Sequence, residues 1–284
     1  MIPVVAGSNP VGHPILPPRV PLHWRTPALR GATPPNAFRA VAHAALTQIE
    51  ANARGMLLSD DPEFLHQLRV GMRRLRAALR AFRSILVRKE ARRVARSLRK
   101  VSPRLGAARD WDVLVARLKA DRGSSGLLRN AQARRAAARR AARRALVSKP
   151  FAGIGPRVRK LATTASSATL AQFGTAALAR AHRKLMAQAD GPDWVDAAAR
   201  HAIRIRVKRL RYSCEFFAPA FPAKRVSPYL AALKELQDIL GALNDISVGR
   251  RLIGFDADEA ALLRRLGSAW TRFAKRRVFW RAPA

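Results

Sequence analysis

The 284-residue sequence predicts an all-α protein in which a set of four helices occurs twice. From Asn36 to the C-terminus, apolar residues recur with the period of a helix, and no segment alternates like a half-buried strand. Glycines and prolines divide this region into eight helical segments, four before about residue 150 and four after about residue 166. Two motifs of the first group return 135 residues later in the second, which indicates an internal duplication.

Residues 1–35 differ from the rest of the chain because they hold half of its 18 prolines. We expect this segment to be an extended or disordered leader, with the globular part beginning at Asn36. The leader has no cationic stretch ahead of an apolar run, so we expect no signal peptide.

The expected helices follow from the residues that punctuate the chain. Asp61 stands before Pro62 and Gly191 before Pro192, as at helix starts. The first group is expected at 36–54, 62–87, 89–121 (with a break near Pro103 or Gly106) and 125–147. The second group is expected at 169–189, 192–217, 228–254 (with a break near Gly241) and 258–280.

The duplication is visible in two motifs. HQLRVGMRRLR at 66–76 matches HAIRIRVKRLR at 201–211, and LGAARDWDV at 105–113 matches LGALNDISV at 240–248. Both matches have an offset of 135, and Phe82 and Phe217 keep the same register. Pairing His43 with His182 needs an offset of 139, which predicts a loop after the first helix that is four residues longer in the first repeat. We place the repeats at about 36–150 and 166–284.

Each copy of the first motif puts a cationic stripe on one face of a helix and an apolar stripe on another. The stripes are His66, Arg69, Arg73, Arg76 and Arg80 in the first copy, and His201, Arg204, Lys208 and Arg211 in the second. Like charges at this spacing repel one another, so the stripes favour binding of a polyanion over stability. Arginine offers paired donors to phosphate oxygens, and each histidine can donate a ring N–H. Glu215 stands where Arg80 would repeat, so the second stripe is shorter and partly neutralised, while Cys214 belongs to the apolar stripe and is expected in the core.

Four further residues are secondary candidates for anion binding. Arg39 and His43 share a face of the first helix, and His182 lies next to Arg183. His43 suits packing as well as it suits binding a ligand. These residues therefore extend the predicted site only if the fold brings them to the stripes.

Asp110 and Asp245 are paired by the repeat, each just after a glycine. We expect them to cap a helix that restarts there or to hold an arginine from the adjacent basic helix, rather than to bind a metal. The fourth helix carries six arginines, at 134, 135, 139, 140, 143 and 144. Because these charges spread around the helix, we expect it to be solvated and to attract anions only at long range.

The composition constrains the partner and the compartment. Fifty-five Lys and Arg against 18 Asp and Glu leave a net charge of +37, which favours a polyanionic partner, although a genome rich in arginine codons is an alternative explanation. A single cysteine excludes an intramolecular disulfide and fits the cytoplasm. The longest uncharged stretch, 161–179, is too rich in Ser and Thr to span a membrane, and no cofactor or metal site is predicted.

The sequences HQLRVGMRRLRAALRAF and HAIRIRVKRLRYSCEFF, with LGAARDWDV and LQDILGALNDISV downstream, resemble the conserved histidine α-helical domain (CHAD) family. The resemblance extends from Asn36 to the C-terminus. It implies two tandem four-helix bundles related by an internal pseudo-twofold, with a basic central groove or cavity. It also implies binding of inorganic polyphosphate, and association of some members with polyphosphate granules. The anion ligands that it implies are His66, Arg69, Arg73, Arg76, His201, Arg204, Lys208 and Arg211.

Many relatives carry a triphosphate-processing domain with an alternating Glu-x-Glu-x-Lys run, which is absent here, so we expect a binding domain and not an enzyme. The favoured hypothesis is a cytoplasmic protein that holds polyphosphate along the two stripes, either on polyphosphate granules or as a soluble polyphosphate sensor. A nucleic-acid-binding protein is the alternative that the net charge favours, but the stripes contain almost no aromatics for base stacking. A metal-dependent phosphohydrolase using His66, His201 and Asp110 or Asp245 would need more carboxylates than lie near them.

Overall fold

The structure is a computed structural model that describes residues 20–120, 125–254 and 258–281. Within these ranges the chain is helical apart from an isolated antiparallel bridge between Leu86 and Thr163, so the predicted all-α class is confirmed. The first group of helices is α1 (Pro34–Leu58), α2 (Pro62–Ala81), α3 (Arg88–Ala120), α4 (Ser125–Leu146), α5 (Lys149–Ala152) and α6 (Ile154–Arg159). The second is α7 (Leu170–Gln188), α8 (Ala197–Phe217), the 3-10 turn η1 (Ala218–Ala220), α9 (Ala223–Ile253) and α10 (Ala260–Ala274).

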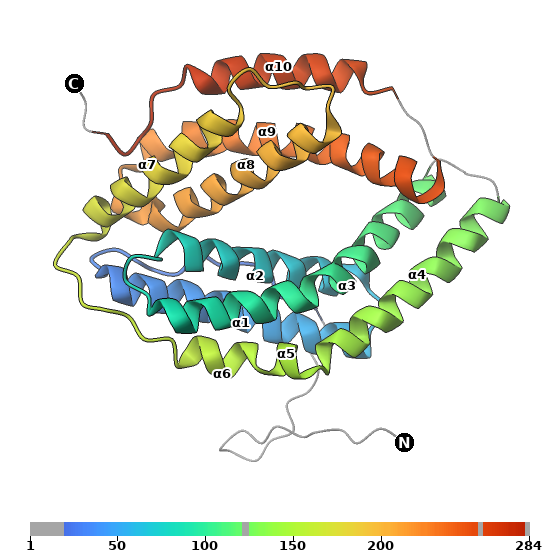
Figure 1. Cartoon of the computed structure of the whole chain (residues 1–284), viewed down its shortest axis with the longest axis horizontal. Coiled ribbons are helices and arrows are strands. Elements are labelled where there is room, and N and C mark those ends of the chain that lie inside the picture. Colours follow the sequence, from blue (N-terminus) through green and yellow to red (C-terminus); the bar gives the residue numbers. More distant parts are fainter. Residues whose placement is uncertain (1–19, 121–124, 255–257, 282–284) are drawn as a thin grey trace.

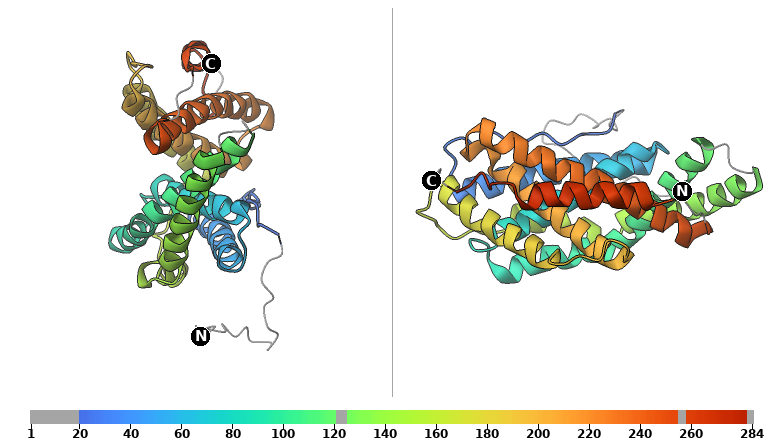
Figure 2. Two further views of the ribbon diagram at one scale, coloured as in Figure 1. Left: turned by 90° about the vertical axis from the view of Figure 1, so that its right-hand side faces the viewer. Right: turned by 90° about the horizontal axis from the view of Figure 1, so that it is seen from above.

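The helices form two halves that lie one above the other, α1–α6 below and α7–α10 above in the view of Figure 1. Within each half, helices that are consecutive in sequence pack together, α1 to α4 in one and α7 to α10 in the other. The halves meet where α2 packs against α8, with further contacts between α1 and α7 and between α3 and α9 (Figure 2). The two helices that carry the predicted stripes therefore form the centre of the molecule.

Helix starts repeat with the offset of the motifs. α2 and α8 begin at 62 and 197, α3 and α9 at 88 and 223, and α4 and α10 at 125 and 260, each pair 135 residues apart. Asp61 and Asp196, also 135 apart, cap α2 and α8, and their carboxylates accept first-turn backbone N–H groups. The duplication seen in two short motifs thus sets the register of three helices in each half.

The predicted pairing of His43 with His182 is wrong. Thr33 and Thr169 cap α1 and α7, each accepting a backbone N–H of the first turn, and these helices begin 136 residues apart, at 34 and 170. The loop before the second helix is shorter in the first half, residues 59–61, than in the second, residues 189–196. The first helices also differ in length, because α1 has 25 residues and α7 has 19, which offsets the difference in the loops.

Aromatic side chains join the two halves at the C-terminal ends of α2 and α8. Phe82 and Phe217, which the repeat pairs, are fully buried with ring centroids 5.1 Å apart. Phe38 packs on Phe82 at 5.7 Å, and Phe173 lies 6.1 Å from Phe217 and 5.6 Å from Phe82. Clusters of this kind combine large buried area with favourable ring geometry. The halves consequently share one core, in which Cys214 is buried as predicted.

Residues 20–33 have no helix but pack onto the first half. Leu29 is buried, and the Asn52 side chain accepts the Leu22 N–H at 3.1 Å while donating to the Leu22 carbonyl at 2.9 Å. The first helix begins at Pro34, two residues before the expected Asn36, because proline is well suited to the first turn. Residues 1–19 of the predicted leader lie outside the described residues.

The predicted breaks in the third and seventh helices are wrong. α3 continues through Pro103 and Gly106, and α9 continues through Gly241. Pro103 lies on the exposed side of α3, where the carbonyl that loses its partner can be hydrated. α9 ends where expected, at Gly254, whose φ of 66° is a left-handed conformation that favours glycine.

Several helix ends also differ from the expected ones. α2 stops at 81 instead of 87, because the chain turns and the Ile85 carbonyl accepts the Thr164 N–H at 2.8 Å. α10 stops at 274 instead of 280, and Phe279 and Trp280 fold back into the core. α8 begins at 197 instead of 192, α9 begins at 223 instead of 228, and α5 and α6 were not predicted. In the described ranges, no helix combines the length and apolarity that crossing a bilayer requires.

Candidate anion-binding site

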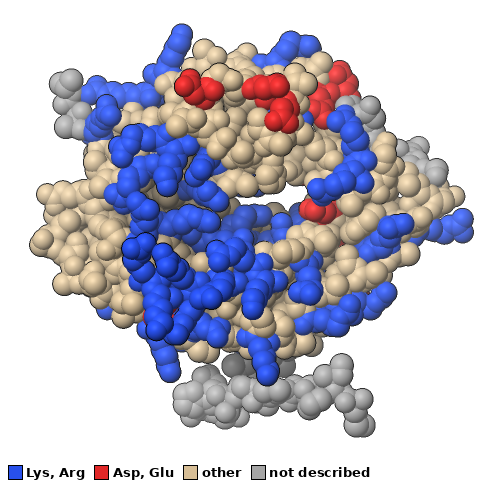
Figure 3. Space-filling model, in the orientation of Figure 1, with Lys and Arg blue, Asp and Glu red and all other residues tan. Residues whose placement is uncertain are grey.

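The packing of α2 against α8 brings four cations of the predicted stripes together. Arg69 and Arg73 come from α2, and Arg204 and Lys208 come from α8. By the offset of 135, Arg69 is equivalent to Arg204 and Arg73 is equivalent to Lys208. Each of these residues is partly buried, and their charges act on one another across the interface. We refer to Arg69, Arg73, Arg204 and Lys208 as the central cations. Figure 3 shows an opening between the halves on one face, with Lys and Arg side chains gathered beside it.

The central cations lack partners in the protein. The Nε atoms of Arg69, Arg73 and Arg204 are buried and have no hydrogen-bond acceptor. Within the part of the chain that the structure describes, none of the four side chains makes an ion pair or a hydrogen bond. A buried polar group without a partner costs about 1–3 kcal/mol, so these groups are unfavourable for the protein alone and available to an external anion.

The pKa values of two central cations, Lys208 and Arg69, are lowered because these side chains are buried beside other positive charges. Burial, followed by the charges of Arg204 and Arg73, lowers the pKa of Lys208 to about 6. Burial and Arg73 lower the pKa of Arg69 to about 10. A polyanion placed among them would favour their charged forms and raise both pKa values.

Asp110 and Asp245 lie near the central cations, but they do not cap helices, because α3 and α9 do not break there. An Asp110 carboxylate oxygen lies 3.7 Å from a guanidinium nitrogen of Arg251, so its ion-pair partner comes from α9 and not from the adjacent basic helix α2. Burial raises the pKa of Asp110, and its charge favours the charged form of Arg69. Among the described residues, no three His, Cys, Asp or Glu side chains lie close enough together to hold a metal ion.

The two stripe histidines differ in environment. His66 is partly buried, and burial followed by the charge of Arg109 lowers its pKa to about 4. His201 is exposed, and its Nδ1 lies 3.3 Å from the Oδ1 of Asn244. Arg109 and Asn244 are themselves equivalent in the repeat, so each histidine meets the same position of the neighbouring helix. Arg109 was not singled out from the sequence, and its positive charge adds to the effect of burial in lowering the pKa of His66.

Arg76 and Arg211 bind the third helix of their own half. Arg76 donates to the hydroxyl of Ser102 and to the Leu98 carbonyl at 2.7 Å. Its repeat partner Arg211 donates to Gln237 at 2.9 Å and pairs with Glu215 at 2.8 Å. The ion pair confirms that Glu215 neutralises the end of the second stripe. Both arginines therefore connect two helices of their own half. Contact with an anion, as predicted, would compete with these hydrogen bonds and with the ion pair to Glu215.

The secondary candidates are not brought to the central cations. Arg39 is exposed and donates to Asn36 and Thr163, and His43 is exposed on the same helix. His182 packs against the rings of Phe273 and Trp280, at 6.4 and 5.8 Å, and Arg183 is exposed beside it. Arg80 is exposed and lines a separate groove between α2, α7 and α8.

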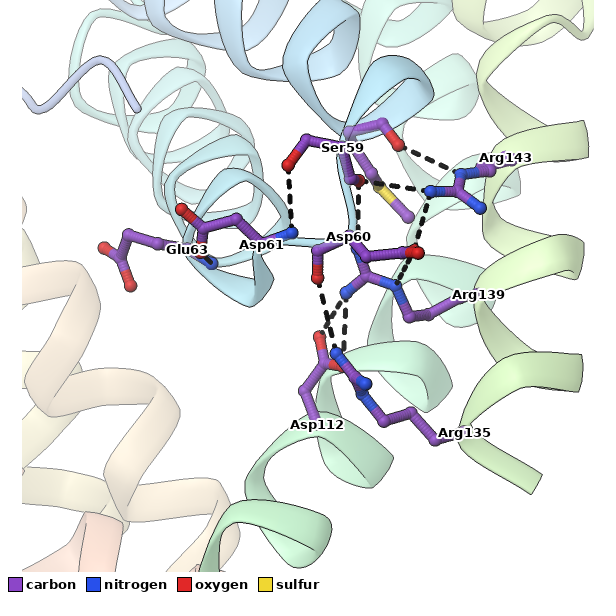
Figure 4. Close-up of polar contacts among 9 residues, drawn as sticks. Ser59, Asp60, Asp61, Glu63, Asp112, Arg135, Arg139 and Arg143 are labelled. Carbon is purple, nitrogen blue, oxygen red and sulfur yellow. Dashed lines mark hydrogen bonds and ion pairs between the residues drawn. The ribbon is translucent and has the colours of Figure 1, made fainter. Parts of the chain in front are cut away.

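The arginine-rich α4 is not simply solvated as predicted. Arg139 is only 3% exposed and pairs with the buried carboxylate of Asp112 at 3.0 Å, while Arg135 approaches the same carboxylate at 2.6 Å (Figure 4). Arg143 donates to the Met56 carbonyl at 3.0 Å and to Asp60 at 2.9 Å. One side of α4 therefore ties the end of α1 to α3. The periodicity of the sequence did not reveal this role, because it depends on Asp112, whose partners come from another helix.

Comparison with known proteins agrees with the architecture. The sequence profile of the CHAD domain matches residues 40–254. The fold is similar to the crystal structure of the CHAD domain from the plant Ricinus communis, with a TM-score of 0.71 and 31% identity over 93% of this chain and 94% of that chain. It is also similar to PptA from Streptomyces chartreusis, with a TM-score of 0.56 and 20% identity over 84% of this chain and 97% of that chain, a likeness that concerns the fold alone. No curated protein sequence matches this chain significantly.

The family profile covers three quarters of the chain and includes all of α2, α3, α8 and α9. Within it lie both copies of the cationic motif and all four central cations. On this match, and on the similarity to the plant domain, the chain belongs to the CHAD domain family.

Proposed function

We propose that the protein binds inorganic polyphosphate, with the central cations of α2 and α8 as the core of the site. The observation that carries the proposal is their lack of protein partners, which leaves the Nε groups of Arg69, Arg73 and Arg204 buried and unbonded. Family membership supports the choice of ligand, because the resemblance already implied polyphosphate. His66 and His201 lie on the same two helices and remain predicted ligands at the start of each stripe.

Polyphosphate suits these residues because it is a linear chain of charged phosphate units. Arginine presents paired donors to such oxygens, and Lys208 supplies a compact charge. Because the cations lose water on burial, their interaction with an anion is stronger than at an exposed surface. Release of counterions from the polymer adds to the affinity, so binding should weaken steeply as salt increases.

Nucleic acid is the alternative ligand. The charge of +37 favours it, but the central cations are not interleaved with aromatic side chains on which bases could stack. Tyr212, an aromatic residue of α8, lies against Arg74, with its ring centroid 4.9 Å from the guanidinium carbon. We therefore assign nucleic acid only non-specific binding to the exposed basic surface.

Binding without catalysis is part of the proposal. The acids near the central cations are Asp110 and Asp245, and Asp110 is engaged by Arg251. Hydrolysis of a phosphate chain with a divalent metal generally uses several carboxylates. We further propose that the protein acts in the cytoplasm, on polyphosphate granules.

A charge-matched pair of variants tests the assignment. The first carries R69Q, R73Q, R204Q and K208Q. The second carries R140Q, R144Q, R264Q and R265Q, which remove four exposed cations of α4 and α10 and leave the same formal net charge, counting every Lys and Arg as charged. Fluorescence anisotropy with labelled long-chain polyphosphate should show a loss of at least about a hundredfold in the first variant, since each lost charged hydrogen bond is worth about 1.5–3 kcal/mol.

The control variant should lose less than about tenfold, because exposed charges are hydrated and screened. Circular dichroism would show that both variants keep their helices. Equal losses in the two variants would place binding on the general basic surface and not at the central cations.

A further inference from the structure

A second basic groove lies between α2, α7 and α8. It has a volume of about 260 Å³, four alanines and Ser213 among its lining residues, and no acidic residue. The cations that line it are Arg80, Arg83, Arg180, Lys184, Arg206 and Arg209, which we call the groove cations. Across the described ranges, none of these six side chains has an ion-pair or hydrogen-bond partner. None of the central cations is among the lining residues.

The repeat shows what this groove lacks. Arg74 of α2 forms a mostly buried ion pair with Glu215 of α8 across the interface. Adding 135 to 74 gives Arg209, and subtracting 135 from 215 gives Arg80. The position equivalent to an ion pair is therefore occupied by two arginines, Arg80 and Arg209, which repel each other. The pseudo-twofold thus relates the cation and anion of the Arg74–Glu215 pair to two cations at the groove.

The equivalent space in the other half is filled. Trp24 of the N-terminal segment stacks on Arg74, with the guanidinium carbon 4.3 Å from its ring centroid, and lies 6.3 Å from the ring of Phe216. The ring centroid of Tyr212 also lies close to the Arg74 guanidinium carbon, at 4.9 Å. The residues equivalent to Tyr212 and Phe216 are Ala77 and Ala81, which line the open groove.

The open groove thus differs from its filled counterpart in three coordinated ways. Alanines replace the two aromatic rings, no aromatic residue equivalent to Trp24 is among the described residues that line the groove, and an arginine replaces the glutamate. Each change alone is a common surface variation. Together they leave an open space lined by positive charges that no acidic lining residue neutralises. At the equivalent position, Glu215 neutralises Arg74.

We propose that this groove is a second anion-binding site, specific for a compact condensed phosphate such as a tripolyphosphate unit, either free or as the end of a longer chain. The volume is below the roughly 300–1,000 Å³ of pockets for drug-sized ligands, so it suits a small, highly charged group. The groove cations come from α2, α7, α8 and the turn after α2, and five of the six are arginines, which suit phosphate oxygens. The site does not depend on polyphosphate binding by the central cations.

Arg80→Glu is the most direct test, because it introduces the carboxylate that the other half already uses. We expect the new carboxylate to pair with Arg209, as Glu215 pairs with Arg74. Isothermal titration with tripolyphosphate should then show at least about tenfold weaker binding. Arg140→Glu, at an exposed site on α4, changes the net charge equally and should alter the affinity by less than about threefold.

A second variant guards against a folding defect. R180Q with K184Q removes two groove cations from the outer helix α7 and should weaken tripolyphosphate binding in the same direction. The variant with R69Q, R73Q, R204Q and K208Q should retain one tripolyphosphate site. Wild-type affinity for tripolyphosphate in both groove variants, or no binding in the central variant, would overturn the proposal.

Long chains distinguish the two sources of the ligand. If the groove takes the end of a polymer, Arg80→Glu also weakens long-chain polyphosphate with free ends, but not the same polymer with blocked ends. If it takes free oligophosphates, only the tripolyphosphate titration changes. Long-chain binding that persists while both groove variants bind tripolyphosphate normally would reject this inference alone and leave the proposed function intact.

Discussion

The guanidinium of Arg69 lies against Gly106 of α3, so closely that a Cβ built on the glycine would be 3.1 Å from an Arg69 nitrogen. Gly241, the repeat equivalent on α9, has nothing within 4 Å of the same position. The sequence places both glycines in matching motifs, but only the first makes room for a central cation. The two positions therefore form a matched pair for mutation.

Gly106→Ala should weaken polyphosphate binding, because the added methyl group displaces the Arg69 guanidinium. We expect a loss of about three- to tenfold, corresponding to part of one charged hydrogen bond. Gly241→Ala should leave the affinity unchanged and stabilise α9 by about 0.5–1 kcal/mol, as alanine does in a helix interior. Anisotropy and thermal unfolding of the two variants measure both effects. Equal affinities would mean that Arg69 is not held in a binding position by α3.

Proton uptake should accompany polyphosphate binding. The free protein holds the pKa of Lys208 at about 6, so this side chain is mostly neutral near pH 7. A bound polyanion raises that pKa, so a proton is taken up and the affinity falls as the pH rises above about 6. Titration calorimetry in buffers of different ionisation enthalpy measures the uptake. Lys208→Arg should reduce it, since arginine stays charged, and unchanged uptake would assign the proton to another group.

Lys208→Met should stabilise the unliganded protein near pH 7. The unfolded lysine has a pKa near 10.4, so between about pH 6 and pH 10 the unfolded state binds more protons than the folded state. Stability therefore rises with pH in this window, and removing the lysine abolishes that dependence. We expect a gain of at least about 1 kcal/mol, or roughly 2–4 °C, at pH 7. The gain should shrink toward pH 10 and be absent in Lys224→Met, an exposed control on α9.

The buried pair between Asp112 and Arg139 should matter more to stability than an exposed pair. Asp112→Asn removes the buried carboxylate that Arg135 and Arg139 share, and it leaves the Arg139 guanidinium, 3% exposed, with only a longer ion pair to exposed Asp60 at 3.6 Å, so we expect a cost of about 3 kcal/mol. Asp238→Asn removes an exposed pair with Lys234 and should cost about 0–1 kcal/mol. Urea unfolding compares the two. Similar values would show that α4 is not anchored through Asp112.

The helices, the cationic stripes and the repeat could be predicted because they depend on the spacing of residues that are close in sequence. The stripes follow from the spacing of residues on α2 and α8, and the offset of 135 alone identifies Arg204 as the equivalent of Arg69. The start of α8 at its Asp196 cap could also have been found, by applying the same offset to Asp61. Such features depend on residues a few positions apart, or on the repeat itself.

The remaining features depend on contacts between distant segments. Pro103 leaves α3 unbroken because its side of the helix faces solvent, which the local sequence does not reveal. Arg76 of α2 donates a hydrogen bond to Ser102 of α3, and Arg139 of α4 forms a buried ion pair with Asp112 of α3. Neither partner could be identified from the local sequence. The groove beside Arg80 is visible only when the two halves are compared in three dimensions.

A competition titration at near-physiological salt tests the central claim most directly. Labelled long-chain polyphosphate bound to the wild-type protein is displaced by unlabelled polyphosphate, duplex DNA or single-stranded RNA at equal phosphate concentration. The account predicts that polyphosphate competes at least about tenfold better than either nucleic acid. The reason is that the partly buried central cations bind a bare phosphate chain more strongly than exposed basic residues bind either polymer. Equal competition by the three polymers would contradict it and identify the protein as a non-selective binder of polyanions.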